Sequence, residues 1–268
     1  MSVNIAATAA VDPRAEIHPG VEIGHYCVIG PNVKLGRGCV LANHVTITGN
    51  TTIGEDNQFF QGAVIGEAPQ DLSYRGEPTK VLIGNKNIFR ESVTVNRATT
   101  KEQGITQVGN NCFLMAGSHV AHDCSVGDRV VMANNVMLGG HSHIHDDVTI
   151  SGGVGVSQFA SIGSFCFVGA MSRVLHDVPP YMLAEGGPAH PRCVNIVALK
   201  RNNFSAEDIK VLQNAFKLLY RSKVGKEQAA ELLLSTGPIR PVLKHVFDFL
   251  DHSRGGRHGR GRDRRRAA

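Results

Sequence analysis

A large apolar residue returns at every sixth position through most of the chain between Val11 and Val174. The repeat runs in three phased blocks, over residues 11–65, 83–95 and 108–174. An α-helix cannot use this interval because six is not a multiple of its 3.6-residue turn, whereas a short strand followed by a corner can. The period is therefore typical of a parallel β-helix built from hexapeptide repeats.

The residue two positions before the large apolar one is usually small, as at Cys27, Val45 and Cys124. Residues two apart on a strand point to the same side, so each repeat sends one small and one large side chain inward. Three successive repeats, each a strand and a corner, then close one triangular coil. About eight such coils, stacked at about 4.8 Å, give a prism about 40 Å tall. The predicted fold class is an all-β solenoid followed by α-helices.

The period is interrupted twice, by the polar, turn-rich residues 66–80 and by residues 96–107. We expect both segments to form loops at corners of the prism, because loops on a rigid scaffold are where binding residues tend to lie. The period ends after Val174, and we assign residues 1–190 to the β-helical domain.

Residues 191–252 are expected to form a helical domain. Ser205 precedes an acidic first turn and resembles a helix N-cap, and further helices are expected over 226–234 and 241–251. Residues 253–268 hold seven Arg and one Asp, a net charge of +6 against +5 for the whole chain. The basic charge is thus a property of a tail that we expect to be disordered, and it does not indicate a nucleic-acid surface.

Five of the six cysteines fall on the small inward position: Cys27, Cys39, Cys112, Cys124 and Cys166. None of them lies three repeats from another, so vertical neighbours cannot pair, and buried reduced thiols are the expected state. This cysteine usage suits a reducing compartment. The first residues lack the basic and apolar regions of a signal peptide, and no apolar run is long enough to insert stably into a membrane.

Residues three repeats apart in the sequence should stack about 5 Å apart in neighbouring coils. Two adjacent columns hold polar and aromatic residues: His122, Gly140 and Gln158 in one, and Asp123, His141 and Phe159 in the next. His119 lies on the same coil as His122. An imidazole beside a carboxylate suits general-base chemistry near neutral pH, and glycine offers an unshielded N–H for an oxyanion. The columns therefore predict a catalytic corner, against the alternative that these are ordinary surface histidines.

A metal site is the other chemical interpretation of this region. Five histidines are candidate ligands: His119, His122, His141, His143 and His145. Zinc takes three or four nitrogen or sulfur ligands. His143, however, should face outward between Ser125 and Ser161, away from the column of His122. We therefore expect no metal.

Seven segments closely resemble the UDP-N-acetylglucosamine acyltransferase family, whose members catalyse the first step of lipid A biosynthesis. They are, in chain order, GEAPQDLSYRGEPT, IFRESVTVNRAT, SHVAHDCSVG, MANNVMLGGH, VGVSQFASIG, DVPPYMLAEG and VNIVALKRNNFS. The resemblance covers roughly residues 5–250. It implies a left-handed parallel β-helix with a C-terminal helical domain, in a cytoplasmic homotrimer with active sites between subunits. It also implies transfer of an (R)-3-hydroxyacyl chain from acyl carrier protein to the 3-hydroxyl of UDP-N-acetylglucosamine, with no cofactor.

The resemblance also assigns roles to residues. It places the general base on His122, supported by Asp123, and the oxyanion contact on the N–H of Gly140. The substrate-binding positions that it implies are Gln70, Asp71, His119, His141, Gln158, Asn195 and Arg201. Ala170 matches the position that sets acyl length, where family members with long chains have Gly. We therefore expect a somewhat shorter or less strictly measured acyl chain.

The chain departs from the family pattern at four positions. Ser73, Ser157, Val197 and Asn202 stand where well-studied members have Lys, His, Glu and Arg. These changes put nucleotide and sugar contacts in doubt, but none affects the expected base or oxyanion contact. Acyl carrier protein is acidic, so a basic patch is expected to bind it. Its candidates are Lys200, Arg201, Lys217 and Arg221, although the last two equally suit a solvated surface.

Three other functions share the hexapeptide repeat. A sister acyltransferase of the same pathway N-acylates glucosamine, but it carries a uridine-binding domain before the repeat, and here the repeat begins by Val11. Acetyltransferases that use acetyl-coenzyme A are a second alternative, against which the first long loop and the helices argue. A γ-carbonic-anhydrase-like or purely structural prism is the third alternative, and bound zinc would favour its carbonic-anhydrase form.

Overall fold

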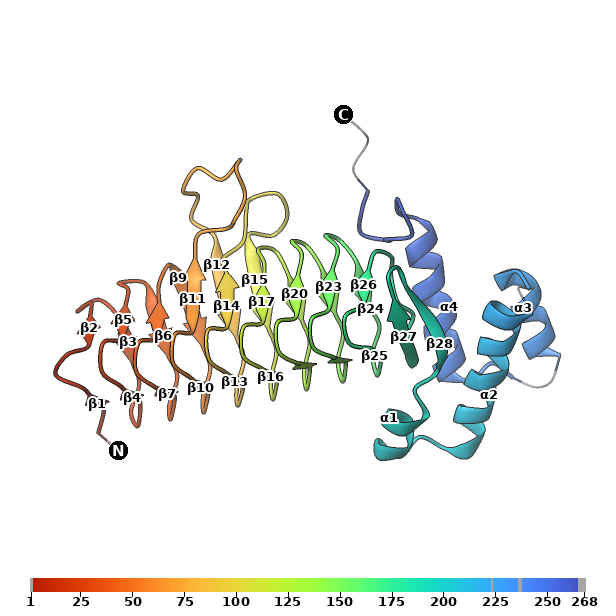
Figure 1. The fold of residues 1–268 in the computed structure, drawn as a ribbon, viewed down its shortest axis with the longest axis horizontal. Coiled ribbons are helices and arrows are strands. Elements are labelled where there is room, and N and C mark those ends of the chain that lie inside the picture. Colours follow the sequence, from red (N-terminus) through yellow and green to blue (C-terminus); the bar gives the residue numbers. More distant parts are fainter. Residues whose placement is uncertain (1, 223, 236–237, 265–268) are drawn as a thin grey trace.

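The computed structural model describes residues 2–222, 224–235 and 238–264. In Figure 1 the chain forms a row of stacked coils that ends in a group of helices. Each coil contributes one short strand to each of three sheets, so every third strand along the chain is a hydrogen-bonded neighbour. The predicted three-sided solenoid of parallel strands is confirmed.

The strands belong to three sheets, one for each face of the prism. The first sheet contains β1 (Asn4–Ile5), β4 (Glu22–Ile23), β7 (Val40–Leu41), β10 (Gln58–Phe59), β13 (Ile88–Phe89), β16 (Phe113–Leu114), β19 (Val131–Met132), β22 (Thr149–Ile150), β25 (Phe167–Val168), β27 (Met182–Gly186) and β28 (Ala189–Val194). The second contains β2 (Ala10–Val11), β5 (Val28–Ile29), β8 (Thr46–Ile47), β11 (Val64–Glu67), β14 (Thr94–Asn96), β17 (His119–Val120), β20 (Met137–Leu138), β23 (Gly155–Val156) and β26 (Arg173–Val174). The third contains β3 (Glu16–Ile17), β6 (Val33–Leu35), β9 (Asn50–Ile53), β12 (Lys80–Ile83), β15 (Ile105–Val108), β18 (Ser125–Val126), β21 (His143–Ile144) and β24 (Ser161–Ile162).

The register between coils follows the predicted interval of three repeats. His119 pairs with Met137, and Met137 pairs with Gly155. The large inward residues form one continuous core along the prism axis. The five cysteines expected at the small inward position are all buried, and every cysteine in the chain is a free thiol. The two-residue alternation within each repeat therefore places side chains as the sequence predicts.

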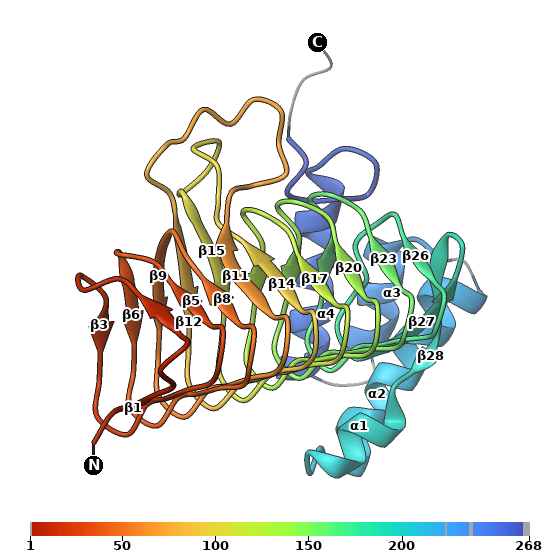
Figure 2. The same cartoon turned by 60° about the vertical axis from the view of Figure 1, so that its left-hand side comes forward.

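The two interruptions of the period are loops, over residues 68–79 and 97–104, and both leave the prism on one side (Figure 2). An ion pair between Lys101 and Asp71 joins them. Arg97 donates hydrogen bonds to the carbonyl oxygen of Gly66 at 2.7 Å and to the hydroxyl of Tyr74 at 3.0 Å. The loops are thus connected to each other above one corner of the prism.

Helices follow the last coil. They are α1 (Ile196–Arg201), α2 (Ala206–Phe216), the π-helical turn η1 (Lys217–Arg221), α3 (Lys226–Leu234) and α4 (Pro241–Arg254). Ser205 accepts a hydrogen bond from the N–H of Asp208 and is the predicted N-cap of α2. An antiparallel hairpin of β27 and β28, which the period did not predict, joins the prism to the helices. Among the described residues, none of the helices combines the length and the apolar content needed to span a bilayer.

The expectation of a disordered tail is wrong for residues 253–264. Helix α4 continues to Arg254, beyond the expected end at 251, and the following residues fold back onto the prism. Asp177 accepts hydrogen bonds from the Ser253 hydroxyl at 2.8 Å and from the N–H of Gly261 at 2.7 Å. The charge composition alone predicted disorder. These hydrogen bonds instead attach Ser253 and Gly261 to Asp177, at the end of the prism. Residues 265–268 lie outside the described residues.

Candidate active site

The corner that carries His122 repeats one backbone conformation in successive coils. Asp123, His141 and Phe159 all have positive φ values, of 60°, 63° and 64°. The N–H of His141 donates to the carbonyl oxygen of His122 at 3.0 Å, and the N–H of Phe159 donates to that of Gly140 at 3.1 Å. The two columns predicted from the period therefore stack at this corner as expected.

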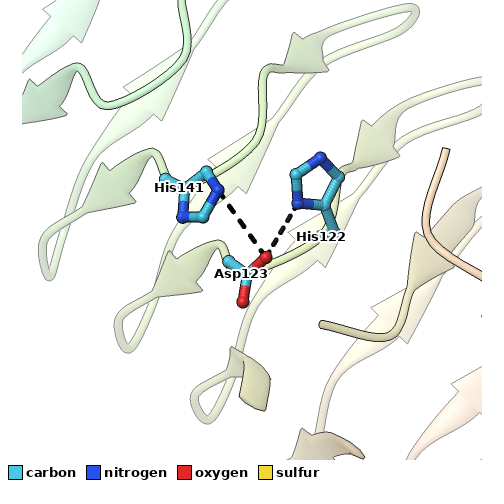
Figure 3. A group of neighbouring side chains, drawn as sticks. All are labelled: His122, Asp123 and His141. Carbon is cyan, nitrogen blue, oxygen red and sulfur yellow. Dashed lines mark hydrogen bonds and ion pairs between the residues drawn. The ribbon is translucent and has the colours of Figure 1, made fainter. Parts of the chain in front are cut away.

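His122 and Asp123 form a hydrogen-bonded pair, with 2.8 Å between Nδ1 and Oδ2 (Figure 3). Both residues are buried. The same carboxylate oxygen accepts hydrogen bonds from the Thr99 N–H at 3.0 Å and from the Thr99 hydroxyl at 2.7 Å. Burial alone would raise the pKa of Asp123, but the hydrogen bonds from His122 and Thr99 hold that pKa below its ordinary value. Asp123 is thus an anion that fixes the ring of His122 and leaves Nε2 for chemistry.

His141 lies on the other side of the carboxylate. Figure 3 shows both imidazole rings directed toward one oxygen of Asp123, and Nε2 of His141 lies 3.7 Å from it. The ring stacks on Phe159 with 4.4 Å between centroids and meets the ring of His122 edge-on at 5.2 Å. Burial lowers the pKa of His141, even though Asp123 and Glu102 act to raise it. The neutral form of His141 is therefore favoured beside His122.

Gly140 lies against the edge of the His122 ring that carries Nε2. A Cβ atom at this position would lie 2.6 Å from Cε1 and 2.7 Å from Nε2 of His122, so only glycine fits without displacing the ring. Within the described part of the chain, the buried N–H of Gly140 has no hydrogen-bond partner. A buried free donor beside a base is suited to stabilise charge that develops on an oxygen atom.

A pocket of about 440 Å³ opens in front of this pair along the second sheet. The residues that line it include Gln70, His119, His122, Gly140, Gln158 and Arg173. Nδ1 of His119 lies 2.7 Å from the Thr94 hydroxyl. Burial, together with the nearby His122, lowers the pKa of His119. The pocket thus brings together the predicted base, the predicted oxyanion donor and three predicted substrate contacts, Gln70, His119 and Gln158.

Five residues predicted to bind substrate or to set acyl length do not line this pocket. One of them, His141, lies beside Asp123 instead. Asn195 and Arg201 line a separate pocket of about 470 Å³, beside strands of the first sheet. Ala170 is exposed and lines neither pocket. The carboxylate of Asp71 pairs with Lys101 and accepts hydrogen bonds from the N–H and hydroxyl of Ser73, at 2.8 and 2.7 Å. Within one chain, these positions therefore do not join the pocket of His122.

Two of the four family departures line the Asn195 pocket. Val197 and Asn202 lie there beside Arg201, so the lining of this pocket departs from the family pattern at two positions. Ser157 lines the pocket of His122. The Ser73 hydroxyl instead donates a hydrogen bond to the Asp71 carboxylate.

Several residues of the site were not predicted. Thr99 and Glu102 come from the second loop, and Arg262 comes from the tail. The Thr106 hydroxyl accepts a hydrogen bond from the backbone N–H of Asp123 at 2.8 Å. Arg173 lies three coils after His119 in the same register, and so could have been found from the period. Thr99, Glu102 and Arg262 leave no such signal, because they are outside the repeat.

The alternative of a metal centre can be tested on the donor set. Among the described residues, His122, Asp123 and His141 are the one group of at least three potential ligands, with ligand atoms within 4.8 Å of one another. His143 lies on the third sheet, paired with Ser125 and Ser161 as expected, outside this group. The Asp123 oxygen that faces both rings already accepts three hydrogen bonds. The arrangement therefore suits a hydrogen-bonded base better than a metal ion.

Comparisons with known proteins agree with this geometry. The family described as "Udp N-acetylglucosamine O-acyltransferase; Domain 2" matches residues 177–260, and "Bacterial transferase hexapeptide (six repeats)" matches residues 14–49 and 105–140. An acyl-[acyl-carrier-protein]–UDP-N-acetylglucosamine O-acyltransferase of Herminiimonas arsenicoxydans is 42% identical over 253 residues, which cover 93% of this chain and 97% of that protein.

Solved structures give the same result. LpxA from Acinetobacter baumannii superimposes with a TM-score of 0.87 at 40% identity, covering 91% of this chain and 95% of that one. The Arabidopsis UDP-N-acetylglucosamine acyltransferase superimposes with a TM-score of 0.80 at 33% identity, covering 93% and 96%. The prism is therefore a left-handed parallel β-helix with a C-terminal helical part. On this sequence identity, which extends over almost the whole chain, the protein belongs to the UDP-N-acetylglucosamine O-acyltransferase family.

Proposed function

We propose that this protein transfers an (R)-3-hydroxyacyl chain from acyl carrier protein to the 3-hydroxyl of UDP-N-acetylglucosamine, the first step of lipid A biosynthesis. The observation that carries the proposal is the placement of Nε2 of His122 against Gly140, whose N–H has no hydrogen-bond partner among the described residues, in the lining of one pocket. A base and an oxyanion donor on adjacent coils are what acyl transfer to a hydroxyl requires.

The reaction proceeds without a covalent enzyme intermediate. His122 Nε2 removes the proton of the sugar 3-hydroxyl, and the oxygen attacks the thioester carbonyl carbon. The carbonyl oxygen becomes an oxyanion that accepts a hydrogen bond from the Gly140 N–H. When the C–S bond breaks, the imidazolium returns its proton to the departing thiolate of acyl carrier protein. The Asp123 carboxylate, 2.8 Å from Nδ1, stabilises the imidazolium while it exists.

The remaining predicted contacts support an assembly of several chains. Asn195 and Arg201 line a pocket beside the first sheet, whereas His122 faces a pocket along the second. A neighbouring subunit would bring its Asn195 pocket to the cleft of His122 and complete a nucleotide site, where Arg201 suits a phosphate. We propose a cytoplasmic homotrimer on this basis, with the free cysteines suiting a reducing compartment.

Two further roles belong to the same proposal. Lys200, Arg201, Lys217 and Arg221 are the basic residues of the helical part that we propose for docking acidic acyl carrier protein. Ala170 is proposed to limit acyl length through a contact made between subunits. Donors with 10, 12 and 14 carbons test this limit, and efficient transfer of the 14-carbon chain alone would contradict it.

The test of the function is a product assay on the purified full-length chain in the presence of a chelator. UDP-N-acetylglucosamine and 3-hydroxyacyl carrier protein are the substrates, and mass spectrometry identifies the product. We expect a single O-acylated sugar nucleotide, formed without added metal. Acetyl transfer from acetyl-coenzyme A, N-acylation of a glucosamine acceptor, or turnover that the chelator abolishes would each contradict the proposal.

A further inference from the structure

The strongest unassigned feature lies behind the catalytic corner, where the carboxy-terminal tail crosses it. Arg262 donates from Nη1 to the backbone oxygen of His141 at 2.6 Å and from Nη2 to a carboxylate oxygen of Glu102 at 2.6 Å. We propose that Arg262 is a positioning residue, which holds His141 and Glu102 in the arrangement that acyl transfer requires. The inference rests on the proposed function and extends it to a part of the chain outside the repeat.

The tail reaches the corner through a defined anchor. Asp177 accepts hydrogen bonds from Ser253 and from the N–H of Gly261, and its own N–H donates to the carbonyl oxygen of Gly259 at 2.8 Å. Arg260 pairs with the buried Asp263 at 2.7 Å. These contacts lie on both sides of Arg262 and fix the direction in which its side chain leaves the tail.

Arg262 approaches the corner from the side of the third sheet, away from the substrate pocket. It lines a small cavity of about 150 Å³ together with Glu102, Asp123 and His143, beside strands of the third sheet. The substrate pocket lies along the second sheet, and Arg262 does not line it. Any effect of Arg262 on turnover therefore acts through the residues it holds.

The contacts continue from Arg262 to the base. Glu102, held by Arg262, places its other carboxylate oxygen 3.3 Å from Nδ1 of His141. Nε2 of His141 then faces Asp123 at 3.7 Å, and Asp123 hydrogen-bonds His122. The side chain of Arg262 is 16% exposed, so its ion pair is less screened by water than a surface pair.

Charge gives the reason for the arrangement. His122 becomes a cation during proton transfer, and a second cation in the ring of His141, 5.2 Å away, would oppose it. The charged or titratable groups around His141 are Asp123 and Glu102, which raise its pKa, and His122 and Arg262, which lower it, with His143 nearby. Burial has the largest effect and lowers the pKa. Arg262 thus offsets the carboxylate of Glu102 and helps to keep His141 neutral.

The test compares Arg262→Ala and Arg262→Lys with the matched control Arg264→Ala. Arg264 belongs to the same tail, and within the described residues its side chain makes one hydrogen bond, from Nε to the Gly261 carbonyl oxygen at 3.5 Å. We expect Arg262→Ala to lower kcat about tenfold or more with little change in KM, since small displacements at a reacting group are costly. We expect Arg262→Lys to restore part of the loss and Arg264→Ala to match wild type.

The pH profile separates this role from a merely structural one. Without Arg262, the charge of Glu102 is unopposed and the pKa of His141 rises. Because a protonated His141 opposes the cation that forms on His122, the acid limb of kcat/KM moves to higher pH by about one unit. Changing Glu102 to Gln in the Arg262→Ala background should move the limb back. A wild-type profile in Arg262→Ala, or equal losses in Arg262→Ala and Arg264→Ala, would overturn the proposal.

A second readout does not depend on activity. NMR titration of the His141 ring in the full-length protein should show a higher pKa in Arg262→Ala than in wild type. If the product assay shows no acyl transfer, the proposed function fails, and this titration still decides the role of Arg262. An unchanged His141 titration would contradict the inference even where turnover falls.

Discussion

Two corners of the prism carry stacked rings on neighbouring coils, and they differ in almost everything else. Tyr26 and His44 stack with 5.1 Å between centroids, and His141 and Phe159 stack with 4.4 Å. All four residues have φ values near +60°. Tyr26 is nevertheless 59% exposed, whereas His141 is 3% exposed. The repeat therefore fixes the backbone at a corner but does not decide the environment of its side chains.

The difference comes from segments outside the repeat. The second loop brings Thr99 and Glu102 to the corner of His141, and the tail adds Arg262. In the described structure, the Tyr26–His44 corner has no equivalent cover, and both side chains are exposed. A buried carboxylate and imidazole interact more strongly than an exposed pair, because water screens them less. This scaffold therefore buries a charged pair where non-repeating segments cover a corner.

The largest predicted effect is at the buried carboxylate. Asp123→Asn replaces the anion that orients His122 and stabilises its charged form, so kcat should fall by about 10²-fold to 10⁴-fold. Asp56→Asn is the matched control, because Asp56 has the same corner conformation on an exposed coil. Steady-state turnover measures both. Equal activity of the two variants would show that the buried carboxylate of the covered corner does not contribute to turnover.

Gly140→Ala should have the next largest effect. Its Cβ would lie within 2.7 Å of the His122 ring, which must move, and kcat should fall about 10²-fold through loss of the oxyanion geometry. Gly152→Ala is the control, since Gly152 also precedes a residue with positive φ and its nearest neighbour would be 3.4 Å away. Single-turnover rates distinguish the two. A fully active Gly140→Ala variant would show that the close fit of Gly140 against the His122 ring is not needed for turnover.

Thr99→Val tests the contribution of the loop. The variant removes the hydroxyl donor 2.7 Å from the Asp123 carboxylate and keeps the backbone donor. We expect kcat to fall about tenfold and the free energy of unfolding to fall by about 1–3 kcal/mol, because a buried charged acceptor loses a partner. Thr52→Val, on the exposed face of β9, should change neither quantity. Denaturant titration and turnover assays measure the two effects.

The next prediction concerns the pH dependence of stability at His143, which we expect to leave turnover at neutral pH unchanged. Burial is the main cause that lowers the pKa of His143 to about 3, below the value of about 6.5 expected in the unfolded chain. The unfolded state therefore binds this proton first as pH falls. Stability from the neutral ring is complete above about pH 6.5 and decreases toward pH 3, by up to about 1.4 kcal/mol per pH unit.

The measurement is unfolding by denaturant between pH 7 and pH 4. His143→Asn should flatten the slope of stability against pH over this range, whereas His18→Asn, at an exposed position, should keep the wild-type slope. An identical slope in wild type and His143→Asn would show that His143 is not buried in its neutral form.

The smallest effect is predicted at the exposed corner. His44→Ala removes half of the stacked pair with Tyr26, yet both rings are in water in the described structure, and unfolding free energy should change by less than about 0.5 kcal/mol. Turnover should not change. Thermal unfolding and the product assay check this. A loss comparable to that of Thr99→Val would remove the distinction between the two corners.

The sequence predicts the scaffold well because the scaffold is periodic. The interval of three repeats alone places His122 beside Gly140, and Asp123 beside His141, as the structure has them. The same period cannot place Thr99, Glu102 or Arg262, because each lies in a segment whose path depends on tertiary contacts. Composition was misleading for residues 253–264, where Asp177 and Asp263 pair with an otherwise repulsive, Arg-rich segment.

We propose that His122 is the base because its corner is covered. The most direct measurement is single-turnover acyl transfer by His122→Ala and His25→Ala at saturating substrates. His25 also precedes a residue with positive φ, but its corner is exposed and its ring contacts only the Thr8 hydroxyl and Tyr26 within the described structure. We predict a rate loss of about 10²-fold to 10⁴-fold for His122→Ala and a wild-type rate for His25→Ala. Near-wild-type transfer by a folded His122→Ala variant would contradict the account.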